Sequence, residues 1–201
     1  MLHDPTRDDV EVRVALPWPD LDARTSLAAE LHDLQVGEEL TEAPPTLAPR
    51  WASGVWWTTS HPLATTASYA CAYEDAVLAT RTALQLVRRE LPPDELVAAQ
   101  QRLEIGFRAL RTPVQGVPER VRLWETPGTD PRVAQWLALP SLEYADLRAY
   151  YDAVAELPVV ISIVGDATRI DMRAVAAMGE LTVVEIDDLE QILRDAEGSD
   201  G

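Results

Sequence analysis

The chain has 201 residues, which is enough for one ordinary domain with a buried core. Apolar residues make up 47% of it and charged residues 25%, so a wholly disordered chain is excluded. Seventeen cationic side chains, all Arg, stand against 34 acidic ones and give a net charge of −17. Phosphate backbones and anionic lipids repel such a chain, so we expect neither nucleic acid nor a membrane as a partner.

The compartment is predicted from three features. Residues 1–9 are polar and acidic, unlike a signal peptide, and we expect them to be a flexible N-terminus. The single cysteine, Cys71, excludes an internal disulfide. The uncharged run Trp51–Tyr73 is long enough to cross a bilayer, but its seven Ser or Thr residues and its proline favour strands. The absence of Lys and Asn is typical of a GC-rich bacterial genome, and we expect a cytoplasmic bacterial protein.

The first elements alternate between strand and helix. Apolar and polar residues alternate over Val10–Leu16, the period of a half-buried strand. Leucines at helical spacing over Leu27–Leu34 predict a helix, and Gly37 stands where a helix C-cap favours glycine. Three glutamates and three prolines within Glu38–Pro49 predict a surface loop.

A hairpin and two helices follow. Gly54–Ser60 and Thr65–Tyr73 are rich in β-branched and aromatic residues, which predicts two antiparallel strands. Apolar spacing over Val77–Val87 predicts a helix that ends before two prolines. A second helix is predicted to begin at Asp94 and to reach Leu110.

The C-terminal third begins with an irregular stretch, Arg111–Pro131. Ser141 is the predicted cap of a helix whose inward face runs over Tyr144–Val154. The nearly continuous apolar run Val159–Val164 predicts a strand covered on both faces. A short helix and a strand over Leu181–Ile186 follow.

This order of elements predicts an α+β fold, with a mixed, largely antiparallel sheet covered by helices. We find no repeat and no internal boundary, so residues 10–193 are interpreted as a single domain. Residues 194–201 are predicted to form an acidic flexible tail.

Chemistry-bearing patterns are few. No H-x-x-E-H, glycine-rich phosphate loop or nucleophile–base pair is present. Cys71 lies within an apolar strand, which favours a core role over catalysis. Asp166 and Asp171 are either a carboxylate pair for acid–base or metal chemistry, or two ordinary caps, and the spacing favours caps. The three histidines are far apart in the sequence: His3, His32 and His61.

One region nevertheless resembles a known family. Ala155–Ile192, AELPVVISIVGDATRIDMRAVAAMGELTVVEIDDLEQI, resembles the closing segment of insulinase-like zinc metallopeptidases, the superfamily of pitrilysin and the mitochondrial processing peptidase. The helix sequence PPDELVAAQQRL, Pro92–Leu103, is similar to another of its segments. The order of elements agrees from Val10 to about Ile192, so the resemblance covers most of the chain.

The resemblance implies one domain of a peptidase built from repeated α+β domains that enclose a chamber. In that family the zinc-bearing domain carries H-x-x-E-H, which this chain lacks. The resemblance therefore implies a domain that is not an enzyme on its own and binds no cofactor. Zinc is expected only in a partner chain. The expected partners are a catalytic H-x-x-E-H chain, in a heterodimer, and a peptide substrate.

Two residues match a functional pair of the family. Its non-catalytic half supplies an Arg and, seven residues later, a Tyr that reach the substrate near the zinc; Arg50 and Trp57 have that spacing here. An Arg can donate hydrogen bonds to a peptide carbonyl. Trp57 keeps a ring and an N–H donor but no phenol, which favours substrate docking over transition-state assistance. The alternative is that Arg50 flanks a loop and Trp57 fills the core.

Three functional hypotheses follow. The first is a non-catalytic accessory subunit of a heteromeric insulinase-like peptidase. The second is a degenerate peptidase-fold protein that binds peptides or assembles complexes without proteolysis. The third is an independent enzyme that uses Asp166 and Asp171, which the lack of a complete catalytic set disfavours.

Overall fold

The structure is a computed structural model that describes residues 1–18, 23–52, 64–109 and 131–188. Its strands are β1 (Leu2–His3), β2 (Val10–Pro17), β3 (Ala48–Ala52), β4 (Ala64–Cys71), β5 (Val160–Gly165) and β6 (Val184–Glu185). Its α-helices are α1 (Ala23–Leu40), α2 (Ala76–Val87), α3 (Leu96–Ala109), α5 (Pro131–Ala138), α6 (Tyr144–Ala155) and α7 (Met172–Ala176).

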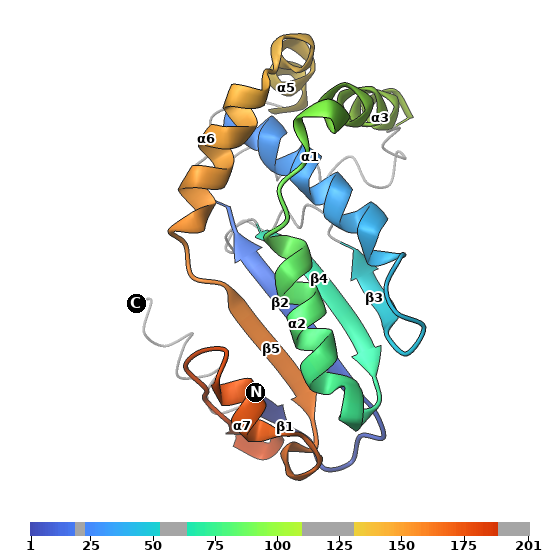
Figure 1. Cartoon of the computed structure of the whole chain (residues 1–201), viewed down its shortest axis with the longest axis vertical. Coiled ribbons are helices and arrows are strands. Elements are labelled where there is room, and N and C mark those ends of the chain that lie inside the picture. Colours follow the sequence, from blue (N-terminus) through green and yellow to red (C-terminus); the bar gives the residue numbers. More distant parts are fainter. Residues whose placement is uncertain (19–22, 53–63, 110–130, 189–201) are drawn as a thin grey trace.

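The strands form one mixed sheet in the order β3-β4-β2-β5-β1-β6 (Figure 1). The pairs β3–β4, β4–β2 and β2–β5 are antiparallel. Strand β1 pairs in parallel with both β5 and β6. The predicted fold class, α+β with a largely antiparallel mixed sheet, is therefore confirmed.

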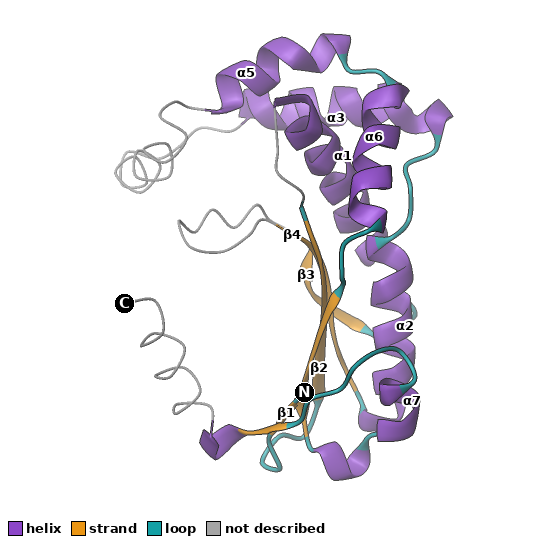
Figure 2. Ribbon diagram, turned by 90° about the vertical axis from the view of Figure 1, so that its left-hand side faces the viewer, coloured by secondary structure: helices purple, strands orange, loops and turns teal. Residues whose placement is uncertain are grey.

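The helices divide into two groups (Figure 2). Helix α2 lies along one face of the sheet, while α1, α3, α5 and α6 gather beyond one of its ends, and α7 lies near the other end. Buried apolar side chains from β2, β4, β5, α1, α2 and α6 form one continuous core. No helix in the described ranges is long and apolar enough to cross a membrane.

Strand β2 follows its sequence pattern. Val10, Val12 and Val14 are fully buried, whereas Arg13 between them is exposed. Alternation places successive side chains on opposite faces of a sheet, so one face of β2 packs against α2 and the other is more open. The prediction of a half-buried strand is confirmed.

The interpretation of β5 as covered on both faces is wrong. Ile163 is 2% exposed, but Val160 is 58% exposed and Ser162 is also exposed. Helix α2 lies along one face of the sheet, and Figure 2 shows no described α-helix along the other face. An apolar run signals a fully covered strand only where both faces carry a second layer.

The first predicted helix extends further than its sequence signals suggested. Helix α1 continues through Gly37 and ends at Leu40, so Gly37 is not its C-cap. Leu40 is 1% exposed, and the Gln35 amide donates to Glu39 Oε1 at 2.9 Å. Burial and this contact within the last turns offset the cost of about 1 kcal/mol that a glycine adds to a helix interior.

The second strand of the predicted hairpin is confirmed, and the loop predicted over Glu38–Pro49 is wrong at its end. Strand β4 agrees with the second predicted strand, but its partner β3 begins at Ala48, within the stretch that we expected to be a loop. The first predicted strand, 54–60, lies outside the described residues. Proline is tolerated on an edge strand, where its missing N–H faces no partner, so Pro49 does not prevent the pairing.

Three other boundaries also differ. Residues 1–9 contain β1, which pairs with β5 and β6 and which the sequence analysis did not predict. Helix α6 is capped by Glu143 and Asp146 in a capping box rather than by Ser141, whose hydroxyl donates to the carbonyl of Ala138 in a preceding 3-10 turn. Of the expected irregular stretch Arg111–Pro131, Pro131 begins α5 and the remainder lies outside the described residues, as does the tail 194–201.

Candidate functional site

The backbone at Arg50 is irregular. Along β3, Pro49 is opposite Tyr69 of β4 and Trp51 is opposite Ser68, which leaves Arg50 as the extra residue of a β-bulge. Bulges break the alternation of side chains and are common on edge strands and beside functional sites. The structure therefore places this sequence-predicted residue at a special backbone position on the edge of the sheet. Trp57, its predicted companion, lies outside the described residues.

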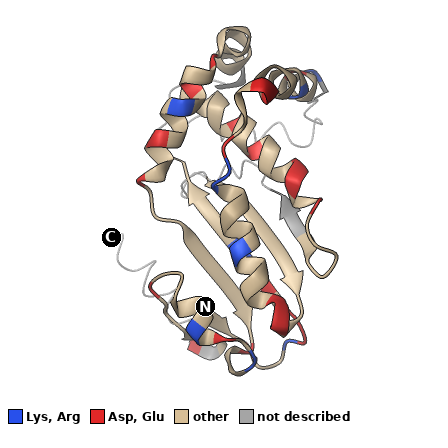
Figure 3. Cartoon of the chain, viewed as in Figure 1, with Lys and Arg blue, Asp and Glu red and all other residues tan. Residues whose placement is uncertain are grey.

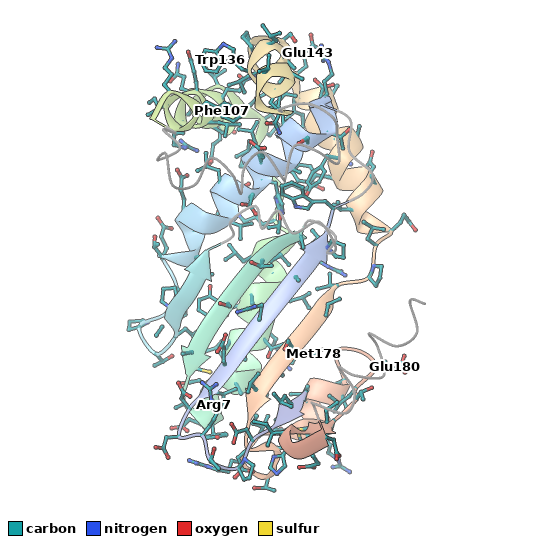
Figure 4. All side chains as sticks on the ribbon, turned by 180° about the vertical axis from the view of Figure 1, so that it is seen from behind. Arg7, Phe107, Trp136, Glu143, Met178 and Glu180 are labelled. Carbon is teal, nitrogen blue, oxygen red and sulfur yellow. The ribbon has the colours of Figure 1, made fainter. Side chains whose placement is uncertain are left out.

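The sheet beside this bulge carries polar side chains on its more open face. Arg13 lies in register between Ser162 of β5 and Ser68 of β4, and Trp51 follows Ser68 on β3. Arg13 also pairs with Glu11 at 3.3 Å on an exposed part of β2. Figure 4 shows these strands side by side from behind. Of these residues, Arg13 and Ser162 are exposed and can offer hydrogen-bond donors to a chain over this face, whereas Ser68 is fully buried.

A second surface, on α3 and α5, is apolar. It exposes Val97 and Ile105 from α3 and Val133, Trp136 and Leu137 from α5. A groove of about 250 Å³ runs between the two helices and is lined by Val97, Trp136, Leu139 and Pro140 together with Gln100, Gln101 and Glu104. Large exposed apolar patches commonly mark interaction sites. We call these residues the α3/α5 surface.

Trp136 is fixed within the α3/α5 surface. Its ring meets the Phe107 ring edge to face at 6.3 Å, and the Arg108 guanidinium lies 5.6 Å from its centroid. Figure 4 shows Phe107 and Trp136 together at the helical end of the molecule. The indole is still 38% exposed. A rigid, partly exposed tryptophan is a typical anchor of protein interfaces.

Cys71 has the environment of a structural residue. It is 6% exposed on β4. Burial, together with the charges of Asp75, Asp9 and Glu74, raises the pKa of its thiol to about 11. The thiolate is the nucleophilic form of cysteine, so this thiol is unreactive at neutral pH. The structure supports the core role over catalysis.

Asp166 and Asp171 act as local caps. Asp166 accepts hydrogen bonds from the backbone N–H and the hydroxyl of Thr168, at 2.9 and 2.7 Å. Those bonds lower the pKa of the Asp166 carboxyl. Asp171 accepts from the backbone N–H of Ala174 at 3.1 Å and caps α7. Each carboxylate is engaged by its own turn, which supports the capping alternative over a catalytic pair.

The sequence analysis missed a buried acidic group on α1. Asp33 is 8% exposed, and burial raises its pKa to about 7, opposed in part by a hydrogen bond from Thr65. Glu30, one turn earlier, also has its pKa raised to about 7 by burial, although the Gln135 amide donates to it at 2.6 Å. The available signal was that Glu30 follows Leu27 by three residues, which puts it within the apolar stripe of the helix.

The two described histidines do not form a metal centre. His32 is 1% exposed, and its Nε2 lies 3.0 Å from the carbonyl oxygen of Val87. Burial lowers its pKa to about 4, so the ring is neutral at pH 7. His3 accepts a hydrogen bond from the backbone N–H of Ala167 at 3.0 Å, at the opposite end of the sheet. The described ranges contain no group of three or more His, Cys, Asp or Glu suited to a metal ion. These residues do not fit a zinc site; His61 lies outside the described residues.

The fold defined above, a mixed sheet with helices on one face and a helical layer beyond its end, is shared with a class of proteases. No family model matches the sequence, and no curated protein matches it. Solved structures do match. The chain is similar to pitrilysin (TM-score 0.61, 14% identity, 87% of this chain and 19% of that one).

Two further matches are proteases of the same type. The periplasmic protease PqqL from Escherichia coli has a TM-score of 0.55 at 11% identity, over 83% of this chain and 20% of that one. A predicted insulinase family protease from Yersinia pestis has a TM-score of 0.53 at 16% identity, over 88% and 44%. The chain spans less than half the length of each of these three structures. Its fold is that of one domain of an insulinase-type protease, as the sequence resemblance implied.

Proposed function

We propose that this chain is a non-catalytic accessory subunit of a heteromeric insulinase-type zinc peptidase. It helps to enclose the chamber and to dock the peptide for a partner chain that carries H-x-x-E-H and the zinc ion. The observation that carries the proposal is an insulinase-type domain fold on a sequence with no H-x-x-E-H. Zinc hydrolysis needs a metal-ligand set and a general base, so both come from the partner.

The polar face of the sheet supports a role in docking peptide. Arg50, at the bulge of β3, donates hydrogen bonds to a carbonyl of the bound peptide, and Trp57 provides an aromatic contact. An edge strand with a bulge, in a sheet that also exposes Arg13 and Ser162, suits an extended chain better than a small molecule.

The α3/α5 surface supports an interface with the catalytic partner. In these similar structures the matched region is a minor part of a longer chain, which suits a domain that packs against others. The groove includes Glu104, and the exposed Asp94 and Glu95 stand at the start of α3. With a net charge of −17, the chain favours a partner whose apolar ridge is bordered by Lys or Arg over a second copy of itself.

The proposal is tested by reconstitution. The tagged chain is purified from its native cells, any H-x-x-E-H chain recovered with it is expressed alone and with this chain, and zinc-dependent cleavage of quenched-fluorescent peptides is measured. We expect activity only from the pair. A partner that is fully active alone, or one whose activity this chain leaves unchanged, contradicts the proposal and favours the degenerate binding module.

Variants of the pair separate docking from structure. We expect Arg50→Ala to lower kcat/KM about tenfold, as loss of a charged hydrogen bond does, with little change in Tm. Arg81→Ala, an exposed arginine on α2, is the matched control; Figure 3 shows a basic residue on that helix. A large fall in Tm with unchanged turnover assigns Arg50 to structure instead.

The interface is tested in the same system. We expect Leu137→Glu on the α3/α5 surface to weaken association of the pair at least tenfold, because it puts a charge into an apolar contact. Leu78→Glu on α2, also an exposed leucine, is the control and leaves association unchanged. Equal affinities for the two variants reject this surface.

We expect the pair to work in the cytoplasm, whereas the similar PqqL is a periplasmic protease.

A further inference from the structure

A pocket of about 160 Å³ lies where the sheet meets the larger group of helices. Residues from the end of β2, from α1 and from the C-terminal ends of α2 and α6 line this pocket, and Figure 1 shows these elements converging there. A cavity of about 150 Å³ admits benzene in another protein, so this volume suits a ligand the size of one ring. Nothing in the proposed function uses this pocket.

The pocket is apolar inside and charged at its mouth. The buried residues Leu16, Val87 and Val154 form its apolar wall, whereas Arg88 and Glu90 at the mouth are exposed. These two side chains carry opposite charges, so the mouth selects neither cations nor anions. Anions are further disfavoured because the C-terminal ends of α2 and α6 carry partial negative charge. The lining therefore suits an uncharged ligand with an apolar body.

His32 brings an unused hydrogen-bond acceptor to this pocket. Its Nε2 lies 3.0 Å from the carbonyl oxygen of Val87, and because a carbonyl only accepts, Nε2 carries the ring hydrogen. Burial lowers the pKa of His32 to about 4, so the ring is neutral at pH 7 and Nδ1 is an acceptor. Nδ1 is buried and has no hydrogen-bond partner in the part of the chain that the structure describes. Buried acceptors are normally hydrogen-bonded, so this nitrogen favours a ligand that donates.

Tyr151 offers the complementary group. Its hydroxyl accepts a hydrogen bond from the backbone N–H of Leu91 at 2.8 Å, which leaves the hydrogen of this hydroxyl to donate. The Tyr151 ring meets the His32 ring edge to face, with the centroids 5.6 Å apart, and both residues line the pocket. A hydroxyl is a single group that donates to a nitrogen such as His32 Nδ1 and accepts from a donor such as Tyr151.

We propose that this pocket binds a small uncharged hydroxyl compound whose apolar body is the size of one ring, such as a phenol, and whose hydroxyl donates to His32 Nδ1. The pocket is separate from the polar sheet face and from the α3/α5 surface. The inference therefore goes beyond the proposed function and holds whether or not a peptidase partner exists.

Two ligands of equal size test the acceptor in the wild-type chain. Phenol and toluene are titrated into ¹⁵N-labelled protein, and the backbone and histidine ring resonances are followed by NMR. We expect phenol to bind with a Kd of about 1 mM, a usual value for so small a ligand. Phenol shifts the His32 Nδ1 resonance upfield because this nitrogen gains a hydrogen bond, whereas toluene, which has no donor, leaves it in place. No saturable binding of phenol, or the same Nδ1 shift with both ligands, overturns the proposal.

Matched variants locate the bound phenol. Ala155 is exposed and lines the pocket, whereas Ala153 of the same helix is exposed away from the lining. We expect Ala155→Phe to weaken phenol binding at least tenfold, because its ring fills the pocket, and Ala153→Phe to leave the affinity unchanged. Wild-type affinity in Ala155→Phe, or shifts confined to the α3/α5 surface, overturns the proposal. If Ala155→Phe does not fold, the decision stays with the two ligands in the wild type.

The hydroxyl-bearing ring has two sources, a free small molecule or a tyrosine side chain of a bound chain. N-acetyl-tyrosine amide, which carries the same phenol on a peptide unit, distinguishes them in the same titration. Weaker binding than that of phenol supports the free small molecule, and tighter binding supports the tyrosine side chain.

Discussion

Strand β5 has two faces with opposite surroundings. Ile163 is 2% exposed within the continuous core, whereas its neighbour Ser162 is exposed beside Arg13 of β2. One residue step along the strand therefore separates the core from solvent. The difference teaches that the apolar run of this strand does not measure how many layers cover it.

The largest expected effect comes from a charge on the covered face. Ile163→Asp puts an unpaired carboxylate into the core, and we expect it to lower the free energy of unfolding by about 4 kcal/mol or more. Circular dichroism and urea denaturation measure the change. A folded variant with wild-type stability breaks the comparison, because it means that this face also tolerates charge.

A smaller effect on stability is expected when acid protonates His32, a buried histidine on the covered side of the sheet. His32 packs against Tyr150 and Tyr151, with ring centroids 5.7 and 5.6 Å away. Burial lowers its pKa from 6.5 to about 4, so below pH 6.5 the unfolded chain binds the proton more readily. This group alone is expected to remove about 3 kcal/mol of stability as the pH falls from 6.5 to 4.

The measurement compares the wild type with His32→Gln by urea denaturation at pH 7 and pH 4. We expect the wild type to lose more stability on acidification than the variant does. The same loss in both proteins removes His32 from the explanation. The comparison between variants is needed because other buried groups, Asp33 among them, gain stability over the same pH range.

A third test concerns α7, which follows β5. Asp171 caps this short helix through the backbone N–H of Ala174, and Val175 is its buried residue. We expect Asp171→Ala to cost about 1 kcal/mol, the usual value of a lost cap. Thermal denaturation measures it, with Asp171→Asn as the variant that keeps the cap. Equal losses in both variants mean that packing of Val175, rather than the cap, holds α7 to the covered side.

The smallest effect is expected on the open face. Ser162→Asp places a carboxylate opposite Arg13 in the register of β2 and β5, where solvent is accessible. We expect stability within about 0.5 kcal/mol of the wild type, since exposed substitutions and surface ion pairs contribute little. Urea denaturation of Ser162→Asp and of Ile163→Asp under the same conditions measures how far the two faces of β5 differ. An unfolded Ser162→Asp variant contradicts the open face and restores the prediction of a strand covered on both sides.

The elements with a clear period were predictable from sequence. The alternation of Val10, Val12 and Val14 located β2, and the spacing of apolar residues located α2 to within one residue. The caps at Asp166 and Asp171 were also favoured in advance. These signals are local, since they depend on residues that lie within one turn or one strand of each other.

The candidate site was predictable only in part. The spacing of Arg50 and Trp57 came from the family resemblance, and the structure adds the bulge at Arg50, which no sequence signal revealed. The α3/α5 surface was missed because Val97 and Trp136 meet only when α3 and α5 lie side by side. Asp33 was missed because an acid on a helix is normally on its solvated face.

By itself, the sequence determined the acidic charge, the absence of H-x-x-E-H, the α+β order of elements and the alternation that turns one side of β2 inward. Tertiary structure alone decided that β1 joins the sheet between β5 and β6, that α1 continues past Gly37, and that one face of β5 stays exposed. The physical reason is that periodicity fixes which side chains share a face, whereas the layers that pack on each face come from segments far apart in the chain.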